Sequence, residues 1–267
     1  MDAYQYLETY IVGQQKLKPE LSIIMEELKS GRNLNILIRG QSGYGKTYLA
    51  KIMCNYIGLE QCRLYLAQES VNIVRTSRVH VLDEAHEIKV PEYLYPMMDS
   101  GEYTFIILTN EFDDLKEPFQ NRCIQFTLLP YSDVELTTIV NKTLRRHGYI
   151  LSNEICSVIA SYSRGNPRVA KVLSKRLSML FKRIGVEDII DNLEESLSIY
   201  FNISRGGFTE FDKVYLEFLK NNGTVGIDTL SRMLCIPKQT LQAEVEPFLV
   251  RQRLIRLTPR GRVYIGD

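Results

Sequence analysis

Three features are missing from this sequence: a strong net charge, paired cysteines and a long uncharged apolar run. The formal net charge is only +1 over 267 residues, so no overall field attracts nucleic acid and any DNA contact must come from a local patch. The hydrophobic content of 45% is sufficient for a sizeable core, and the length allows two or three modest domains.

The five cysteines are odd in number, scattered, and include no Cys-x-x-Cys pair. This pattern supports neither a disulfide framework nor a zinc site, and it fits a reducing cytosol. The N-terminus has no basic segment followed by an apolar run, so no signal peptide is predicted, and no apolar stretch is long enough to cross a bilayer. We therefore expect a cytoplasmic protein without a membrane partner.

What the sequence does contain is a glycine-rich phosphate-binding motif. The apolar segment Leu34–Ile38 leads into Gly40-x-x-x-x-Gly45-Lys46-Thr47, and a helical pattern follows over Tyr48–Ile57. This order is typical of a phosphate-binding loop, because the glycines permit a tight turn while backbone N–H groups and the helix N-terminus face one anion. We expect Lys46 to reach the β- and γ-phosphates of ATP and Thr47 to ligate Mg²⁺. The residues expected to bind nucleotide in this segment are Gly40, Gly43, Tyr44, Gly45, Lys46, Thr47 and Tyr48.

Two adjacent carboxylates end the apolar run Arg78-Val-His-Val-Leu-Asp-Glu. An ionised carboxylate at the end of a buried strand needs a cation or strong hydrogen bonds. In phosphate-loop enzymes such a pair is the second nucleotide motif, in which Asp83 would hold Mg²⁺ and Glu84 would orient and deprotonate the attacking water. Taken alone, the pair is equally consistent with a solvated turn. Its position downstream of Lys46 and Thr47 favours the catalytic interpretation.

A third apolar strand, Tyr103–Asn110, ends in two small polar residues. Thr109 or Asn110 could contact the γ-phosphate or the water, and an ordinary strand-ending turn is the alternative. The strands alternate with helical segments, which indicates a doubly wound parallel sheet over residues 1–130.

The remainder of the chain predicts two smaller domains. Residues 131–203 show no convincing strand, which indicates a small helical domain. Its helical patterns extend approximately over Ser132–His147, Ser152–Ser161, Pro167–Arg183 and Val186–Ser196. Residues 204–267 predict three helices followed by two short β segments, the outline of a winged helix, and Tyr200–Phe208 is expected to be a linker. Arginines clustered on the β segments favour contacts with DNA phosphates, and a winged helix that binds protein is the alternative.

In this order the motifs resemble those of the AAA+ ATPases, and among them the RuvB family, bacterial motors that drive branch migration of Holliday junctions. The similarity is carried by four segments besides the two nucleotide motifs: Tyr10–Gln14, Leu94–Met97, Ser163–Ala170 and Glu246–Arg262. Together they extend over nearly the whole chain. The resemblance implies an AAA+ core with a P-loop, a helical lid domain and a winged-helix domain, in the three parts defined above.

The resemblance also implies roles at individual positions. Asn110 would be the first sensor, where the family usually has threonine; Arg122 would be an arginine finger acting on ATP in the neighbouring subunit; and Arg168 would be the second sensor. The remaining residues implied to face the nucleotide are Ile11, Val12, Gly13, Tyr131 and Pro167. The wing residues implied to contact the DNA backbone are Arg256, Arg260 and Arg262.

The resemblance implies a homo-oligomeric ring, with a hexamer as the preferred size, on duplex DNA or four-way junctions. RuvB has a β-hairpin between the acidic motif and the first sensor that contacts its junction-binding partner RuvA, whereas here Pro96–Tyr103 leads directly into the sensor strand. This departure argues against the family's standard docking to a RuvA-like protein.

Two other functions stay open. One is a clamp-loader or helicase-loader switch in DNA replication. The other is a winged-helix regulator that binds DNA and uses nucleotide only to control its oligomerisation. The presence of both Glu84 and Arg122 argues against the regulator, because a pure switch has less need of them.

Overall fold

The computed structural model describes residues 1–67, 77–89, 91–111 and 114–266, and its contacts divide the chain into two compact units. The first unit consists of Met1–Ile139 together with Gly165–Arg168, and the second of Val140–Arg164 together with the chain after Arg168. The division into three domains at residues 130 and 203 stays a prediction beside this grouping.

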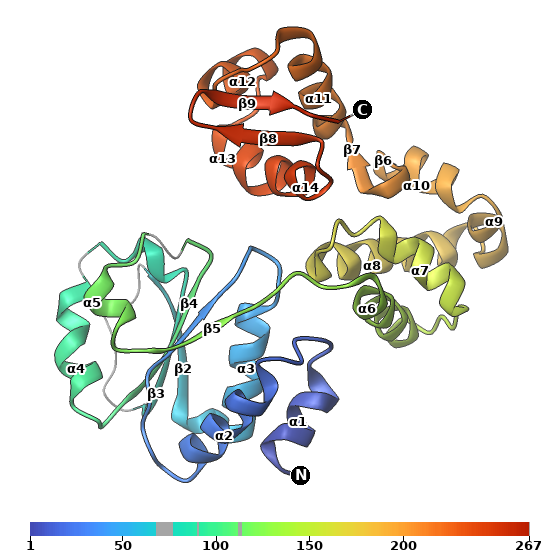
Figure 1. The fold of residues 1–267 in the computed structure, drawn as a ribbon. Helices are drawn as coiled ribbons and strands as arrows, with labels where there is room; N and C mark the ends of the chain where they lie inside the picture. Colours follow the sequence, from blue (N-terminus) through green and yellow to red (C-terminus); the bar gives the residue numbers. More distant parts are fainter. Residues whose placement is uncertain (68–76, 90, 112–113, 267) are drawn as a thin grey trace. The chain divides into compact units, whose positions relative to one another are not determined.

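The first unit is built on a sheet of five strands in the order β2-β3-β4-β1-β5 (Figure 1). Every neighbouring pair is parallel, which confirms the predicted α/β class. Strands β3 and β4 are apolar runs buried along their whole length, as expected for central strands of a sheet covered on both faces. The strands are β1 (Ile36–Arg39), β2 (Cys62–Leu66), β3 (Val79–Asp83), β4 (Thr104–Thr109) and β5 (Ile124–Thr127).

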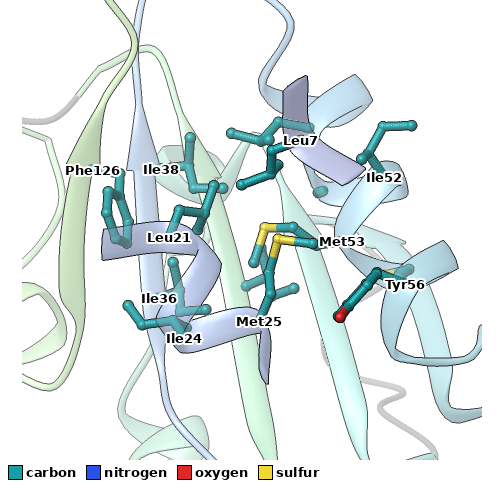
Figure 2. Close-up of a cluster of buried hydrophobic side chains, with 14 of the residues drawn as sticks. Leu7, Leu21, Ile24, Met25, Ile36, Ile38, Ile52, Met53, Tyr56 and Phe126 are labelled. Atoms are coloured by element: carbon teal, nitrogen blue, oxygen red, sulfur yellow. The ribbon is translucent and has the colours of Figure 1, made fainter. Parts of the chain in front are cut away.

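Helices cover both faces of this sheet (Figure 1). Because side chains alternate along a strand, Ile36 and Ile38 point to one face and Leu37 to the other. The first face packs against α1, α2 and α3 in the larger core (Figure 2), and the second packs against α4 and α5. These helices are α1 (Ala3–Tyr10), α2 (Lys18–Lys29), α3 (Lys46–Ile57), α4 (Tyr95–Asp99) and α5 (Glu117–Gln120).

Helix α1 is absent from the sequence prediction, which finds only an apolar cluster over residues 5–14. The helix has eight residues, too few for a clear apolar periodicity. Asp2 caps its N-terminus by accepting a hydrogen bond from the backbone N–H of Gln5 at 2.8 Å, and Leu7 is fully buried. Tertiary packing therefore stabilises a helix that the local sequence pattern does not predict.

The helical segment that follows the sheet agrees with the prediction except near its end. One helix is expected over Val186–Ser196, but Asn192 leaves helical geometry, with φ −124° and ψ 42°, and two helices form instead. The helices are α6 (Asp133–Arg146), α7 (Asn153–Ser161), α8 (Pro167–Arg183), α9 (Val186–Asp191) and α10 (Leu193–Phe201). In the described part of the chain, every helix is too short or too polar to span a membrane.

The expected linker at Tyr200–Phe208 is ordered, because β6 (Ile203–Ser204) and β7 (Phe208–Thr209) pair antiparallel around a tight turn. The predicted winged-helix outline follows. Thr209 opens its first helix with a capping box, in which Thr209 and Asp212 exchange hydrogen bonds. The elements are α11 (Glu210–Asn222), α12 (Ile227–Leu234), α13 (Lys238–Thr240), a π-helical turn (Leu241–Val245), α14 (Glu246–Arg251), β8 (Ile255–Thr258) and β9 (Gly261–Tyr264).

One core side chain makes the stability of the first unit depend on pH. His80 on β3 is fully buried, with its ring stacked on Phe105 at a centroid distance of 5.2 Å. Burial lowers the pKa of His80 to about 4 from its ordinary value of 6.5. Below pH 6.5 the unfolded chain therefore takes up a proton that the folded chain excludes, so the free energy of unfolding falls as the pH drops toward 4.

We expect the wild type to lose about 2 kcal/mol of stability through His80 between pH 7 and pH 5, and His80→Phe to lose correspondingly less. Urea unfolding of both proteins at the two pH values measures the difference. His147→Gln, which changes an exposed histidine on the last turn after α6, should retain the wild-type pH dependence. Identical pH slopes for His80→Phe and wild type would contradict the prediction.

Candidate nucleotide-binding site

The loop between β1 and α3 has the geometry that its glycines predict. Gly43 and Gly45 have φ of 85° and 97°, in the left-handed region that favours glycine. Lys46 is 6% exposed, and its Nζ donates hydrogen bonds to the carbonyl oxygens of Gly40 at 2.7 Å and Gln41 at 3.3 Å. The ammonium group of Lys46 is thus held against the loop that would carry the phosphates.

Several predicted residues that are distant in the sequence interact electrostatically with Lys46. Burial lowers the pKa of Lys46, the carboxylates of Glu84 and Asp83 oppose this shift, and Arg168 adds to it. All four residues belong to the first unit. The structure therefore places the two acids and the predicted second sensor within interaction range of the phosphate-loop lysine.

Thr47 and Asp83 form a direct contact across the edge of the sheet. The hydroxyl of Thr47 donates to Asp83 Oδ2 at 2.7 Å, and Asp83 Oδ1 accepts from the backbone N–H of Glu84 at 3.0 Å. No cluster of three or more histidine, cysteine or acidic side chains lies close enough to hold a metal ion among the described residues. A hydroxyl beside one carboxylate nevertheless fits Mg²⁺, which takes few protein oxygens when phosphates supply the others.

Glu84 adopts a left-handed backbone conformation, with φ 54°, immediately after β3. Such a conformation costs a non-glycine residue roughly 1–2 kcal/mol and is often retained at functional sites. Glu84 Oε2 lies 3.7 Å from His86 Nδ1, which in turn lies 3.3 Å from the hydroxyl of Thr109. His86 is a neighbour of the acid that the sequence analysis does not identify.

The two polar residues at the end of β4 lie in different environments. Thr109 is fully buried, accepts a hydrogen bond from the backbone of Glu111 and contacts His86, whereas Asn110 is exposed. Of the alternatives that the sequence leaves open, Thr109 is joined to the acidic motif. The sensor role of Asn110 stays a prediction.

Asn166 is a second residue that the sequence analysis does not identify. Its amide donates to the carbonyl oxygen of Ser42 in the phosphate loop at 3.0 Å, and its Oδ1 accepts from the backbone N–H of Arg168 at 2.9 Å. A side chain at Gly43 would overlap the Asn166 amide. Pro167 begins α8 directly afterwards. This contact holds the segment that carries Arg168 against the loop.

Residues on both sides of the loop support the predicted nucleotide pocket. Tyr131 donates from its hydroxyl to the carbonyl oxygen of Tyr44 at 3.3 Å, and burial raises its pKa to about 12. Tyr48 donates to the carbonyl oxygen of Tyr10 at 3.3 Å, just before the Ile11–Gly13 segment. Ile11 is buried, Val12 is partly exposed, and Gly13 has φ 70°.

The predicted arginine finger lies apart from these contacts, on the turn between α5 and β5. Arg122 donates two hydrogen bonds to the carboxylate of Asp99, at 2.9 and 3.0 Å, and one to the carbonyl oxygen of Pro118 at 2.7 Å. Its guanidinium also lies 4.4 Å from the centre of the Tyr95 ring. Asp99 raises the pKa of Arg122, so the group is a permanent cation in a fixed orientation.

The three predicted DNA-binding arginines have different surroundings. Arg256 and Arg260 are exposed on the β8–β9 wing. Arg262 is largely buried and donates to Glu246 at 2.7 and 3.2 Å, and Glu246 also accepts from the hydroxyl of Tyr215. Arg262 therefore has a partner within its own domain, and its contact with DNA stays a prediction.

Comparisons with known proteins point to one family. Residues 205–264 match the family described as the RuvB C-terminal winged helix domain. The Holliday junction branch migration complex subunit RuvB of Rickettsia africae is 29% identical over 295 residues, covering 97% of this chain and 86% of that protein. Its counterpart in Mycoplasma genitalium is 26% identical over 292 residues, covering 94% and 92%.

A solved structure extends this similarity to the fold. The structure titled as the Thermotoga maritima RuvB Holliday junction branch migration motor is 26% identical, with a TM-score of 0.84. It covers 96% of this chain and 93% of its own. The likeness therefore includes both compact units rather than the nucleotide-binding core alone.

Gly43 and Gly101 allow a controlled test of the contact between Asn166 and the loop. Both glycines have positive φ, but a methyl group at Gly43 would displace Asn166, whereas nothing lies within 4 Å of one at Gly101. We expect Gly43→Ala to bind ATP about tenfold more weakly, a loss of about 1.4 kcal/mol, and Gly101→Ala to bind it as the wild type does.

Titration with a fluorescent ATP analogue measures the two affinities, and thermal unfolding checks that both variants lose a similar, small amount of stability from the left-handed backbone. Equal ATP affinities for the two variants would show that the Asn166 contact does not matter for binding.

Proposed function

We propose that this chain, a RuvB-like protein with the α/β fold of the AAA+ ATPases, hydrolyses ATP to drive branch migration of Holliday junctions. The observation that carries this proposal is the similarity to a named branch-migration subunit over 97% of this chain and 86% of that protein. It includes the nucleotide motifs of the first unit and the winged helix of the second. All five cysteines are free, which supports a location in the reducing cytoplasm.

Four residues of the first unit would carry out hydrolysis. Lys46 would bind the β- and γ-phosphates, and Thr47 and Asp83 would hold Mg²⁺, which when bound neutralises charge on the phosphate oxygens. The Glu84 carboxylate would orient the attacking water and accept its proton. His86 Nδ1 lies 3.7 Å from that carboxylate.

Turnover would depend on assembly into a homo-oligomeric ring, for which we propose a hexamer. The Arg122 side chain is 29% exposed and is oriented by Asp99, so it can present a cation to the ATP of a neighbouring subunit. A cation that reaches the transferred phosphoryl group only after assembly makes hydrolysis dependent on the ring. Arg168, whose charge lowers the pKa of Lys46, would respond to the γ-phosphate within the same subunit.

A RuvA-like partner would need an unusual docking surface. Between β3 and β4, residues 84–89 and 91–103 form turns and the short α4, and this described part contains no strand. The proposed motor therefore binds its junction through the exposed arginines of the wing, and its partner, where it has one, through a surface other than the family's hairpin.

A strand-exchange assay tests the proposal directly. The substrate is a synthetic four-way junction with ATP and Mg²⁺, with and without a RuvA-like junction-binding protein. We expect the wild type to convert the junction to duplex products. ATP turnover without conversion under either condition would favour the loader function and contradict the motor.

Glu84→Gln should lower both ATP turnover and junction conversion by about 100-fold or more while ATP binding is retained, because the amide cannot accept the proton. Glu87→Gln is the matched control, since Glu87 is exposed on the following turn. Steady-state hydrolysis and nucleotide titration separate the two effects. Wild-type turnover in Glu84→Gln would remove Glu84 from the role of base.

The wing arginines should differ in what they do. Arg256→Ala and Arg260→Ala should each weaken junction binding and reduce the slope of log affinity against log salt by about one, as expected for a lost phosphate contact. Arg262→Ala should instead lower the free energy of unfolding by about 3 kcal/mol, because it leaves Glu246 buried without its cation. Salt-dependent DNA binding and urea unfolding measure these effects, and unchanged stability in Arg262→Ala would contradict the distinction.

A further inference from the structure

The chain passes from the second unit to the first at the peptide bond between Arg164 and Gly165. In the first unit, the Asn166 side chain donates a hydrogen bond to the carbonyl oxygen of Ser42 in the phosphate loop, at 3.0 Å. There is no room for a side chain at Gly43, because it would overlap the Asn166 amide. A shift of the loop at Ser42 and Gly43 therefore either moves the Asn166 side chain or breaks its hydrogen bond to Ser42.

On the other side of the boundary, Arg164 is anchored in the winged helix. Its guanidinium donates to both carboxylate oxygens of Asp212, at 3.1 and 2.9 Å, and to the carbonyl oxygen of Glu244 at 2.8 Å. Asp212 is fully buried, and the Arg164 side chain is 13% exposed. A bidentate ion pair with so little solvent is held far more firmly than a surface pair.

Further contacts fix the same residue on other sides. The Arg164 guanidinium lies 4.1 Å from the centre of the Phe248 ring, and the Arg164 carbonyl oxygen accepts a hydrogen bond from Arg251. Both the side chain and the backbone of Arg164 are thus bound to α14. Arg164 is therefore restrained by an ion pair, a ring contact and a backbone hydrogen bond at the same time.

The backbone between the two anchors has little slack. Arg164 and Gly165 both have positive φ, 57° and 71°, and a left-handed conformation at a non-glycine residue persists only when its surroundings impose it. Arg164 and Asn166 are separated by two peptide units, a span of at most about 7 Å. Gly207 packs closely on this turn, since a side chain there would come within 3.0 Å of Arg164 Cγ and of the Tyr162 carbonyl oxygen.

We propose that Arg164 is the positioning residue that transmits the state of the phosphate loop to the winged helix, through the link Arg164-Gly165-Asn166. This inference rests on the proposed function, since ATP is what moves the loop. It differs from the role predicted for Arg168, which concerns the γ-phosphate. Arg164 contacts no nucleotide in this scheme. It joins the Gly165–Arg168 segment, which would move with the phosphate loop, to the winged helix that would contact DNA.

Hydrogen exchange of the full-length protein, with and without the non-hydrolysable analogue AMP-PNP and Mg²⁺, tests the link. In the wild type we expect the analogue to slow exchange in the phosphate loop and to change the exchange rate of α11 and α14 amides by about fivefold or more, a typical size for coupling between sites. Arg164→Met retains the apolar stem and loses the ion pair. It should keep the protection of the loop while the response of α11 and α14 falls below about twofold.

Arg262→Met is the matched control, because it breaks a comparable buried ion pair, with Glu246 at the start of α14, and leaves the contacts of Arg164 in place. It should retain the response of α11 and α14. Arg164→Lys, which keeps the charge but not the bidentate geometry, should recover part of the response.

The outcomes separate the two proposals. Absence of loop protection in the wild type would contradict nucleotide binding, and the coupling with it. Loop protection without any response in α11 and α14 of the wild type would overturn the coupling alone. So would a full response in Arg164→Met, or an equal loss of response in Arg262→Met, which would reduce Arg164 to a stabilising residue.

Discussion

The hydrogen bond between the Thr47 hydroxyl and the Asp83 carboxylate is the contact on which the candidate site depends. It exists because the sheet is parallel, so that the carboxyl ends of β1, β3 and β4 meet at one edge. The same edge joins the phosphate loop to β4 through the backbone N–H of Gly40 and the carbonyl oxygen of Thr109 at 3.2 Å. The predicted ligands and the proposed base therefore lie at the N-terminus of α3 and at the end of β3, next to this edge of the sheet.

The second constraint on this structure is the short segment Arg164–Asn166, which has contacts at both of its ends. Within a few residues the chain is bound first to Asp212 of the winged helix and then to Ser42 of the phosphate loop. In the proposed motor, ATP-dependent changes would reach the DNA-binding surface through the contacts at the two ends of this short link. Residues 84–89 and 91–103, between β3 and β4, contain no strand, and in the proposed function the winged helix would therefore carry more of the interaction with DNA and partners.

Much of the fold could be predicted from local patterns. The strands before the phosphate loop and before Asp83 are strong apolar runs, and helix α8 was bounded correctly at Pro167 and Arg183 because a proline opens it and its apolar positions recur with the helical period. The errors occur where local signals are weak. Helix α1 is short, Asn192 interrupts an otherwise helical pattern, and the expected linker pairs as β6 and β7 because its glycines permit a tight turn.

The sequence by itself predicts the nucleotide chemistry, because the loop glycines, Lys46 and Thr47 form one local motif and the adjacent Asp83 and Glu84 form another. Only the tertiary structure decided which polar side chains have partners within the protein. Asn166 pairs with Ser42 across 124 positions, Arg164 with Asp212 across 48, and Arg262 with Glu246 across 16. Such partners depend on the path of the folded chain, and no local pattern specifies them. The sequence therefore predicts Arg262 as a DNA contact without indicating its Glu246 partner, and it gives no sign of the partners of Arg164.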